Sequence, residues 1–221
     1  MLLVTGDVHA DMDDFRKRPF GRIRKNDCVL VCGDFGILWD GGREEKKEIV
    51  RLGRRKYHTL FIDGAHENFD LLESYPVTEW NGGKVRVISG NLLYLMRGQV
   101  YTIGGRKVFT FGGGESPDRQ YRAEHRTWWP QEMPTEPEMA EGLRNLEENG
   151  WLVDYIVTHE APTGFKHLLE EDDEDFNRLN VYLERVHEQC RFKRWIFANY
   201  HVNKRMSSDT EAVFDGVVRL E

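Results

Sequence analysis

Five short apolar runs, each followed at once by a polar corner, constrain the fold of this chain more than any other feature of its sequence. Short continuous runs of aliphatic and β-branched residues are typical of strands that are buried on both faces. In an open α/β sheet, ligand-binding groups collect just beyond the carboxyl ends of such strands. The sequence therefore predicts buried strands with functional side chains at one end. The runs are LLVT (2–5), CVLVC (28–32), TLFID (59–63), DYIVT (154–158) and RWIFA (194–198).

Helical patterns lie between several of these runs. Apolar residues recur at steps of three and four in the segments 43–55, 138–150 and 176–190. Glu67 follows the third run, and we expect it to begin a helix because its charge suits a helix N-terminus. The alternation of strand and helix predicts an α/β fold.

The middle of the chain has a different pattern. Segment 84–114 contains several short strand-like runs separated by glycine turns, and Gly104-Gly105 is a two-residue hairpin signal. The C-terminal segment 211–220, EAVFDGVVRL, predicts a further hairpin. We therefore expect one domain over residues 1–221, in which strands of mixed direction accompany the α/β part.

Residues 115–137, ESPDRQYRAEHRTWWPQEMPTEP, are expected to form a long lid-like excursion. Loops of this length in compact domains are usually functional or mobile. Arg122 is the candidate for substrate binding, because a guanidinium group matches the geometry of phosphate oxygens. Two interpretations remain open at this point: a lid that holds a phosphate, or a surface loop fixed by Trp128 and Trp129.

The polar corners are rich in aspartate and histidine. Strand ends that converge would bring these side chains into one pocket. Carboxylate oxygens and neutral imidazole nitrogens together suit Zn²⁺, Mn²⁺ or Fe and match Ca²⁺ poorly. The sequence therefore predicts a transition-metal site. Its candidate residues are Asp7, His9, Asp34, His66, His159 and His201.

The order of the corner motifs resembles a known family. GDVHA, GDFG, GAHEN, VTHEAP and FANYHVNK are similar, in this order, to the five signature blocks of the calcineurin-like metallophosphoesterases. In that family the blocks read GDxH, GD, GNH(D/E), a strand-end His and GHxH. The resemblance extends from Gly6 to about Lys204, and the flanking segments are similar to small stand-alone bacterial and phage members. Five ordered blocks are far more specific than any single one.

The resemblance implies a fold and an activity. The implied fold is a four-layer α/β/β/α sandwich with two mixed β-sheets and the metals at their shared edge. The implied activity is metal-dependent hydrolysis of a phosphoester, as a phosphatase or phosphodiesterase. Two divalent cations about 3.5–4 Å apart clamp the substrate oxygens and activate a water. His66 would lie near the leaving oxygen, as an acid or as a stabiliser of charge.

The resemblance also implies a set of ligands. Asp7, His9 and His201 would hold the first metal, and Asp34 would bridge both metals. His159 would hold the second metal, together with two further family residues.

Those two further positions differ in this chain. Ala65 stands where the family has Asn, and Asn199 stands where the family has the first His of GHxH. Ala65 has no ligand atom, and Asn199 offers only an amide oxygen, which is a weak ligand for such a metal. Since both changes affect the second metal, we expect one well-bound metal and a second that is weak or absent. Three explanations stay open: a deliberate substitution that silences the protein, a naturally one-metal enzyme, or a metal-binding pseudoenzyme that binds a phosphorylated ligand without turnover.

The charge and composition of the chain limit the classes of partner that we expect it to bind. The 221 residues carry a net charge of −7, which gives no reason to expect nonspecific binding to nucleic acid. We expect a phosphorylated small molecule or a phosphodiester as substrate, with a nuclease as a less favoured alternative. No apolar run approaches the ~20 residues that span a bilayer, so no membrane partner is expected. Three cysteines without a CxxC motif predict a cytoplasmic protein. The acidic run 170–175 is expected to be solvated.

Overall fold

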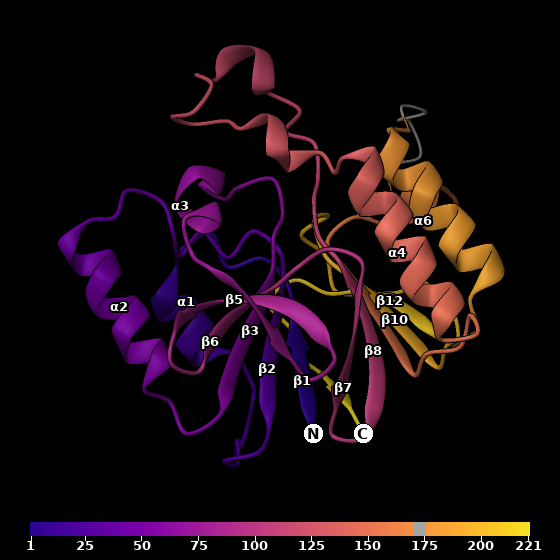
Figure 1. Ribbon diagram of the computed structural model, residues 1–221, viewed down its shortest axis with the longest axis horizontal. Coiled ribbons are helices and arrows are strands. Elements are labelled where there is room, and N and C mark those ends of the chain that lie inside the picture. The colour runs from indigo at the N-terminus through magenta and orange to yellow at the C-terminus, as the bar shows by residue number, and fades with distance from the viewer. Residues whose placement is uncertain (170–175) are drawn as a thin grey trace.

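The computed structural model describes residues 1–169 and 176–221, and within these it has two β-sheets with helices on their outer faces (Figure 1). The acidic run 170–175 lies outside the described residues. The seven-stranded sheet has the order β13 (Val218–Leu220), β1 (Leu2–Thr5), β2 (Cys28–Cys32), β3 (His58–Ile62), β6 (Leu92–Leu95), β5 (Gly83–Ser89) and β4 (Val77–Trp80). The six-stranded sheet has the order β11 (Lys204–Arg205), β12 (Thr210–Ala212), β10 (Arg194–Phe197), β9 (Tyr155–Thr158), β8 (Arg106–Phe111) and β7 (Gln99–Ile103).

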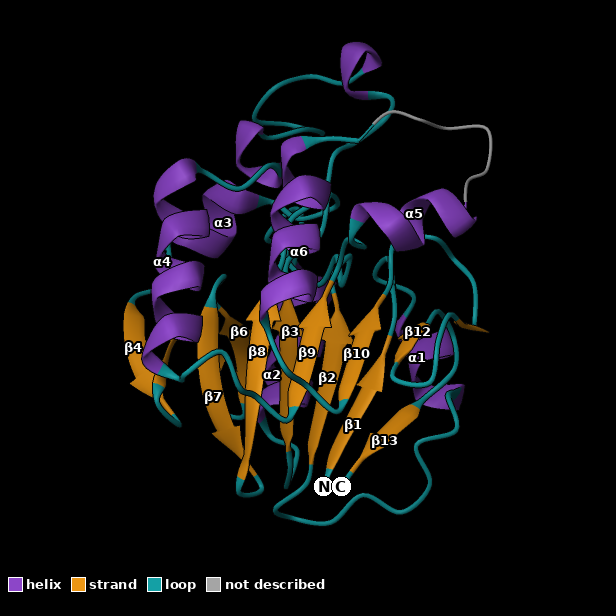
Figure 2. Cartoon of the chain, turned by 90° about the vertical axis from the view of Figure 1, so that its right-hand side faces the viewer, coloured by secondary structure: helices purple, strands orange, loops and turns teal. Residues whose placement is uncertain are grey.

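Both sheets are parallel at their centres and antiparallel at their edges. The parallel pairs include β1 with β2, β2 with β3, β8 with β9 and β9 with β10. Parallel strands end at the same edge of a sheet, and Figure 2 shows the central parallel strands of both sheets, among them β2, β9 and β10, rising toward one group of loops. The hairpin predicted at Gly104-Gly105 is present, with Ile103 opposite Arg106 in the β7–β8 ladder.

Helices cover the outer face of each sheet (Figure 1). On the seven-stranded sheet they are α1 (Met12–Lys17), α2 (Arg43–Gly53) and α3 (Phe69–Glu73). On the six-stranded sheet they are α4 (Glu136–Glu148), α5 (Thr163–Leu169) and α6 (Arg178–Gln189). Among the described residues, no helix is long and apolar enough to cross a membrane.

Alternation along the strands explains the four layers. Successive side chains of a strand point to opposite faces, so a strand that is apolar throughout supplies two cores. In β1, Val4 packs between the sheets with Ile196 of β10, whereas Leu3 packs outward in the cluster that includes Leu52 of α2. A third cluster joins the six-stranded sheet to α4 and α6. The α/β/β/α sandwich that the family resemblance implies is therefore confirmed.

Two local predictions were wrong. The C-terminal segment does not form a hairpin, because β12 pairs with β10 and β13 pairs with β1 in the other sheet. The chain crosses between the sheets at 213–216, where Val213 N–H donates to Phe197 O and Thr5 Oγ1 donates to Gly216 O. Glu67 does not begin a helix, because α3 starts at Phe69 and the side chain of Asn68 caps it.

Candidate metal centre

The structure brings the predicted aspartates and histidines together at the shared edge of the two sheets. Asp7 and Asp34 follow β1 and β2 of the seven-stranded sheet. His159 and His201 follow β9 and β10 of the six-stranded sheet. Each sheet therefore contributes a part of one cluster, as parallel strand ends do in open α/β folds.

The corners that carry these residues have an unusual backbone. His9, Asp34, Asn199 and His201 all have φ between +44° and +67°. Side chains other than glycine enter this left-handed region at a cost of about 1–3 kcal/mol, and such residues gather at functional sites. Hydrogen bonds hold the first two corners together, because the N–H of His9 donates to Asp34 O at 2.8 Å. The backbone thus aims these side chains at the cluster before any ligand binds.

Gly33 makes room for the cluster. Its φ is +97°, and a Cβ atom at this position would lie 2.3 Å from Nδ1 of His159. A side chain here would displace the imidazole as well as strain the backbone. The glycine that precedes Asp34 is therefore required by the close approach of the two sheets.

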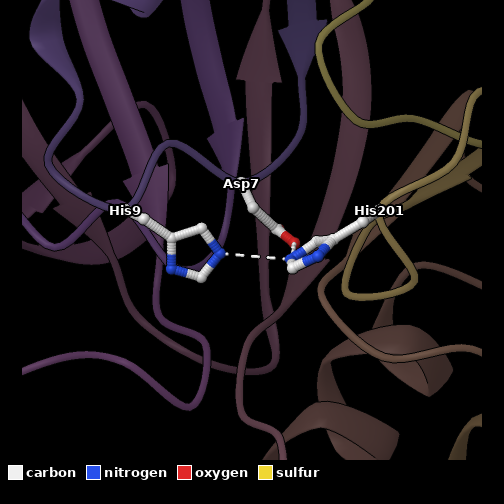
Figure 3. A group of neighbouring side chains, drawn as sticks. All are labelled: Asp7, His9 and His201. Carbon is white, nitrogen blue, oxygen red and sulfur yellow. Dashed lines mark hydrogen bonds and ion pairs between the residues drawn. The ribbon is translucent and has the colours of Figure 1, made fainter.

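Asp7, His9 and His201 form one group that can hold a metal ion (Figure 3). His201 Nε2 lies 3.1 Å from Asp7 Oδ2 and 3.1 Å from His9 Nε2. Asp7 is only 1% exposed, and its buried Oδ2 forms no hydrogen bond of regular geometry among the described residues, although it lies within ion-pair distance of His201. A buried carboxylate oxygen without a donor is costly, and a coordinated cation removes that cost. These three residues therefore fit a metal.

The protonation of this group follows from its contacts. The contact with Asp7 raises the pKa of His201, and Asp34 adds to this. Burial lowers the pKa of His9, and this outweighs the opposing effect of the two nearby aspartates. His201, which is more readily protonated, therefore faces His9, which releases its proton more readily. Neutral imidazole is the form that ligates a metal.

Asp34 lies at the centre of the cluster and contacts His66. Its Oδ1 accepts a hydrogen bond from the backbone N–H of His66, and its Oδ2 lies 2.8 Å from His66 Nδ1. Burial alone would raise the pKa of Asp34, but His159 and the hydrogen bonds from His66 lower it well below its usual value. Asp34 is thus an anion, and with His9 and His66 it forms a second possible metal-binding group.

His159 is arranged to ligate through one defined nitrogen. It is fully buried, and its Nδ1 lies 2.8 Å from the carbonyl oxygen of Cys32. A carbonyl oxygen only accepts, so Nδ1 carries a hydrogen, and Nε2 offers its lone pair when the ring is neutral. Burial lowers the pKa of His159, but Asp34 and Asp7 outweigh this and raise the pKa, so a bound metal would replace a proton at Nε2. That Nε2 has no hydrogen-bond partner in the described part of the chain and lies 3.6 Å from Asp34 Oδ1. Such a backbone contact behind the ring is typical of metal-ligating histidines.

The two positions that depart from the family pattern have different surroundings. Ala65 is buried and supplies no ligand atom. Asn199 lies at the corner after β10, where its Nδ2 donates to Glu160 Oε2 at 3.2 Å. Tyr200 O–H donates to the other oxygen of the same carboxylate, and Glu160 is 3% exposed. The amide of Asn199 is therefore held by a buried glutamate that the sequence analysis did not identify.

The excursion 115–137 extends beyond the strand ends and contacts the cluster (Figure 1). It contains the 3₁₀ turns η1 (Arg119–Tyr121) and η2 (Pro130–Glu132). Arg122 Nη2 lies 2.8 Å from His66 Nε2, and Arg122 Nε pairs with Asp118 at 2.7 Å. Since a guanidinium group only donates, His66 Nε2 accepts and its Nδ1 hydrogen points to Asp34. Arg122 thus fixes the tautomer of His66.

The same excursion is anchored on the seven-stranded side. Trp129 is buried, donates through Nε1 to Asp70 at 2.8 Å and packs edge-on against Trp39. His125 Nδ1 lies 3.1 Å from the same carboxylate. Trp129 therefore anchors the excursion, while Arg122 of the same excursion reaches the cluster, so the lid and the fixed loop both stay predictions.

Sequence reasoning missed two residues that support the corners. Glu67 is buried, and its Oε1 accepts from the N–H groups of Phe35 and Gly36 next to Asp34. The buried guanidinium of Arg18 donates to the backbone oxygens of Gly6 and Asp7. Neither residue had a clear sequence signal, because Arg18 stands in a basic run with the exposed residues Arg16 and Lys17.

Comparison with known proteins identifies the family of the chain. A sequence model of the calcineurin-like phosphoesterase family matches residues 1–202. No curated protein matches the chain. Among solved structures, the chain is similar to phosphopantetheinyl hydrolase from Mycobacterium tuberculosis, with 16% sequence identity and a TM-score of 0.48. That similarity covers 96% of this chain and 89% of the other.

Proposed function

This chain belongs to the calcineurin-like phosphoesterase family, and we propose that it hydrolyses a small phosphorylated substrate with one well-bound divalent metal ion. The observation that carries the proposal is the pair of buried ligand atoms without partners, Asp7 Oδ2 and His159 Nε2. Buried polar atoms are rarely left unpaired, and a cation at the first position would satisfy Asp7 Oδ2, whereas His159 Nε2 is the atom available to the second position. The first metal would be held by Asp7, His9, Asp34 and His201.

The donor set favours Mn, Fe or Zn over Ca or Mg, because it contains imidazole nitrogen as well as carboxylate oxygen. When bound, such a cation supplies Lewis-acid chemistry to a phosphoryl oxygen and to the attacking water. Asp34 would contact both metal positions. His159 would serve the second position with weak help from Asn199, so that position is expected to be weakly filled or empty.

His66 and Arg122 are the proposed residues for the phosphoryl group and the leaving oxygen. Arg122 would exchange its contact with His66 for two phosphate oxygens, which a guanidinium fork binds well. Once Arg122 has moved away, His66 would take up a proton from solvent on Nε2 and donate it to the leaving oxygen, while Asp34 holds its Nδ1 hydrogen. The excursion 115–137 would act as a lid on a single domain that covers residues 1–221.

A restored second site tests the proposal. Ala65→Asn and Asn199→His, made together, are expected to raise the bound Mn²⁺ from about one to about two per chain, because the donors of the family pattern return. Metal content is measured by elemental mass spectrometry after dialysis. Hydrolysis of bis(4-nitrophenyl) phosphate and of 4-nitrophenyl phosphate is expected to rise at least about tenfold.

The matched control keeps the double substitution and adds His201→Ala, which removes a ligand of the first metal. This control is expected to lose the first metal and most of the activity. If the double variant binds no more metal and hydrolyses no faster than the parent chain, the site assignment is wrong.

A second candidate function is a pseudoenzyme that binds a phosphorylated ligand without turnover, and Ala65 and Asn199 favour it. Steady turnover by the unaltered chain excludes this candidate. Cleavage of single-stranded nucleic acid by the restored variant would instead indicate a nuclease.

We also propose a cytoplasmic location, since Cys28, Cys32 and Cys190 are all free, buried thiols.

A further inference from the structure

A pocket of about 630 Å³ opens directly beside His9 and His66 and extends toward α2. Its volume lies in the range of small-molecule sites. Because the two histidines line it, a group that occupies this pocket adjoins the place where the phosphoester would react. The pocket is therefore the nearest space for the alcohol part of a substrate.

The walls of this pocket are apolar and acidic. Met12, Ile37 and Trp39 supply the apolar surface. Asp40, Glu44 and Glu48 are among its four carboxylates, and within the described chain no lysine or arginine lines it. A lining with carboxylates and no cation is unusual beside a centre that is proposed to bind phosphate anions.

Helix α2 separates its charges between two faces. Glu44 and Glu48 are four residues apart, so they share the face that lines the pocket. Arg43, Lys46, Lys47, Arg51 and Arg54 line a separate, open surface of the same helix. Lys47 pairs with Glu44 at 2.5 Å, and Arg16 pairs with Glu48 at 2.7 Å. The remaining pocket carboxylates are hydrogen-bonded to backbone N–H groups, as Glu45 is to those of Trp39 and Asp40.

A second cavity, of about 670 Å³, borders Asn199 and Glu160 and differs in charge. Its lining includes Arg119 and Lys166 as well as acidic residues. Cations near the centre therefore lie on this side and on the excursion, where Arg122 is found. Arg119 pairs with Glu115 at 2.6 Å, so the charged residues that line this cavity balance, whereas the lining beside α2 has carboxylates only and disfavours an anionic part of a ligand.

We propose that the pocket beside α2 holds the alcohol part of the substrate and selects aromatic or apolar alcohols that are neutral or positively charged. Alcohols that carry further anionic groups, such as a nucleotide chain, are rejected by its carboxylates. This inference rests on the proposed function and names the substrate class of the same site.

The test uses three phosphate esters that differ only in charge: those of tyramine, 4-ethylphenol and 3-(4-hydroxyphenyl)propionate. In the two charged esters, two carbons separate the charge from the ring, and 4-ethylphenol keeps those two carbons without a charge, so the three leaving groups have similar reactivity. Phosphate release with Mn²⁺ is measured for this chain and for the Ala65→Asn, Asn199→His variant. The tyramine ester is expected to exceed the propionate ester about tenfold or more in kcat/KM.

Glu44→Lys places a cation at the exposed rim of the pocket and is expected to reduce this preference to less than about threefold. Glu188→Lys is the matched control, because it makes the same charge change on the exposed side of α6 and should leave the preference unchanged. Binding of tyramine and of the free propionate to the metal-free chain, measured by saturation-transfer NMR, provides a readout that needs no turnover. Tyramine is expected to bind more tightly, and Glu44→Lys is expected to abolish the difference.

The outcomes separate the two proposals. Equal hydrolysis of the three esters, with equal binding of the two alcohols, overturns the selectivity and leaves the proposed function standing. If Glu44→Lys and Glu188→Lys lose the preference for the tyramine ester equally, the proposed selectivity of the pocket is also overturned. The preference would then depend on the net charge of the protein and not on the pocket. If neither the parent chain nor the double variant hydrolyses any ester, the proposed function fails and this inference fails with it.

Discussion

Asp63 and Asp7 are two buried carboxylates that follow strands of the same sheet, yet their surroundings differ completely. Asp63 follows β3, and its oxygens accept hydrogen bonds from Tyr94 O–H at 2.8 Å and from Arg97 Nε at 2.9 Å. Arg97 also donates to the backbone oxygen of Gln131, which ties the excursion to the sheet. Asp7 follows β1, and its Oδ2 has no hydrogen-bond donor among the described residues. One cluster is complete within the described protein, and the other is not.

The difference separates structure from function. A buried carboxylate with a full set of donors stabilises the fold, whereas one without donors reserves its oxygens for a ligand. The histidines show the same contrast. His66 has partners on both ring nitrogens, whereas His159 has a buried Nε2 without one. Such unsatisfied atoms also occur elsewhere in the described chain, so it is their convergence with other aspartates and histidines at one edge of the sheets that marks the candidate centre.

The largest expected effect comes from breaking the complete cluster. Arg97→Met leaves the Asp63 carboxylate buried without its cation, with a hydrogen bond from Tyr94 O–H remaining, and it is expected to reduce the free energy of unfolding by about 3–5 kcal/mol. Urea denaturation followed by circular dichroism measures this. The control is Arg106→Met, because Arg106 is exposed and lies 3.7 Å from Asp154, a pair expected to contribute about 0–1 kcal/mol. Similar losses in both variants would remove the distinction between the clusters.

The next effect comes from completing the unsatisfied cluster. Mn²⁺ at a hundredfold excess over its dissociation constant is expected to stabilise the chain by about 2.7 kcal/mol, because the metal binds only the folded state. Thermal unfolding with Mn²⁺ and with EDTA measures this difference. Asp7→Asn, which keeps the shape and removes the charge, should abolish most of the stabilisation. Full stabilisation of Asp7→Asn would place the metal elsewhere.

A smaller effect is expected from Arg122, which completes the partners of His66. Arg122→Ala should lower kcat/KM about tenfold, or about 1.4 kcal/mol, because one charged contact with the phosphate is lost. The measurement uses whichever of the parent chain and the Ala65→Asn, Asn199→His variant turns over faster. Arg126→Ala changes an exposed arginine of the same excursion and should have no effect. Equal effects of the two substitutions would favour a general role of charge over contact with phosphate.

Glu67 lies between the two extremes, since Oε1 has backbone donors and the buried Oε2 has none. Burial, supported by nearby Asp34, raises its pKa well above the usual value of 4.5. The folded state therefore holds this proton more tightly than the unfolded state. This contribution to stability is present below pH 4.5 and is lost as the pH rises toward the pKa of the folded state.

Glu67→Gln removes this dependence. Relative to the parent, its free energy of unfolding in EDTA is expected to increase by about 1 kcal/mol or more between pH 4.5 and pH 8. Urea denaturation at several pH values measures the difference. Glu147→Gln, on the exposed side of α4, should track the parent at every pH. A parallel course for Glu67→Gln would show that the carboxylate is not held in its protonated form.

Most residues of the cluster could be predicted from the sequence, because the ends of the strands can be recognised in it. Short apolar runs give the strands, and parallel pairing places Asp7, Asp34 and His159 at one edge. The supporting residues could not be predicted, because Glu67 and Glu160 matter through contacts with distant corners. The C-terminal hairpin was wrong for a similar reason: local alternation predicts strands but does not say which sheet each strand joins.

The division of the cluster between the two sheets has a mechanical consequence. A cation held by Asp7 and His201 would cross-link the two halves of the sandwich at one edge, where Asp7 is rigidly buried and His201 is more exposed. Any motion that separates the sheets would stretch the coordination before it disturbs either outer helical layer. The spectrum of a bound reporter ion such as Co²⁺ would therefore register how closely the halves are docked, and its loss on heating should precede the melting of the helices.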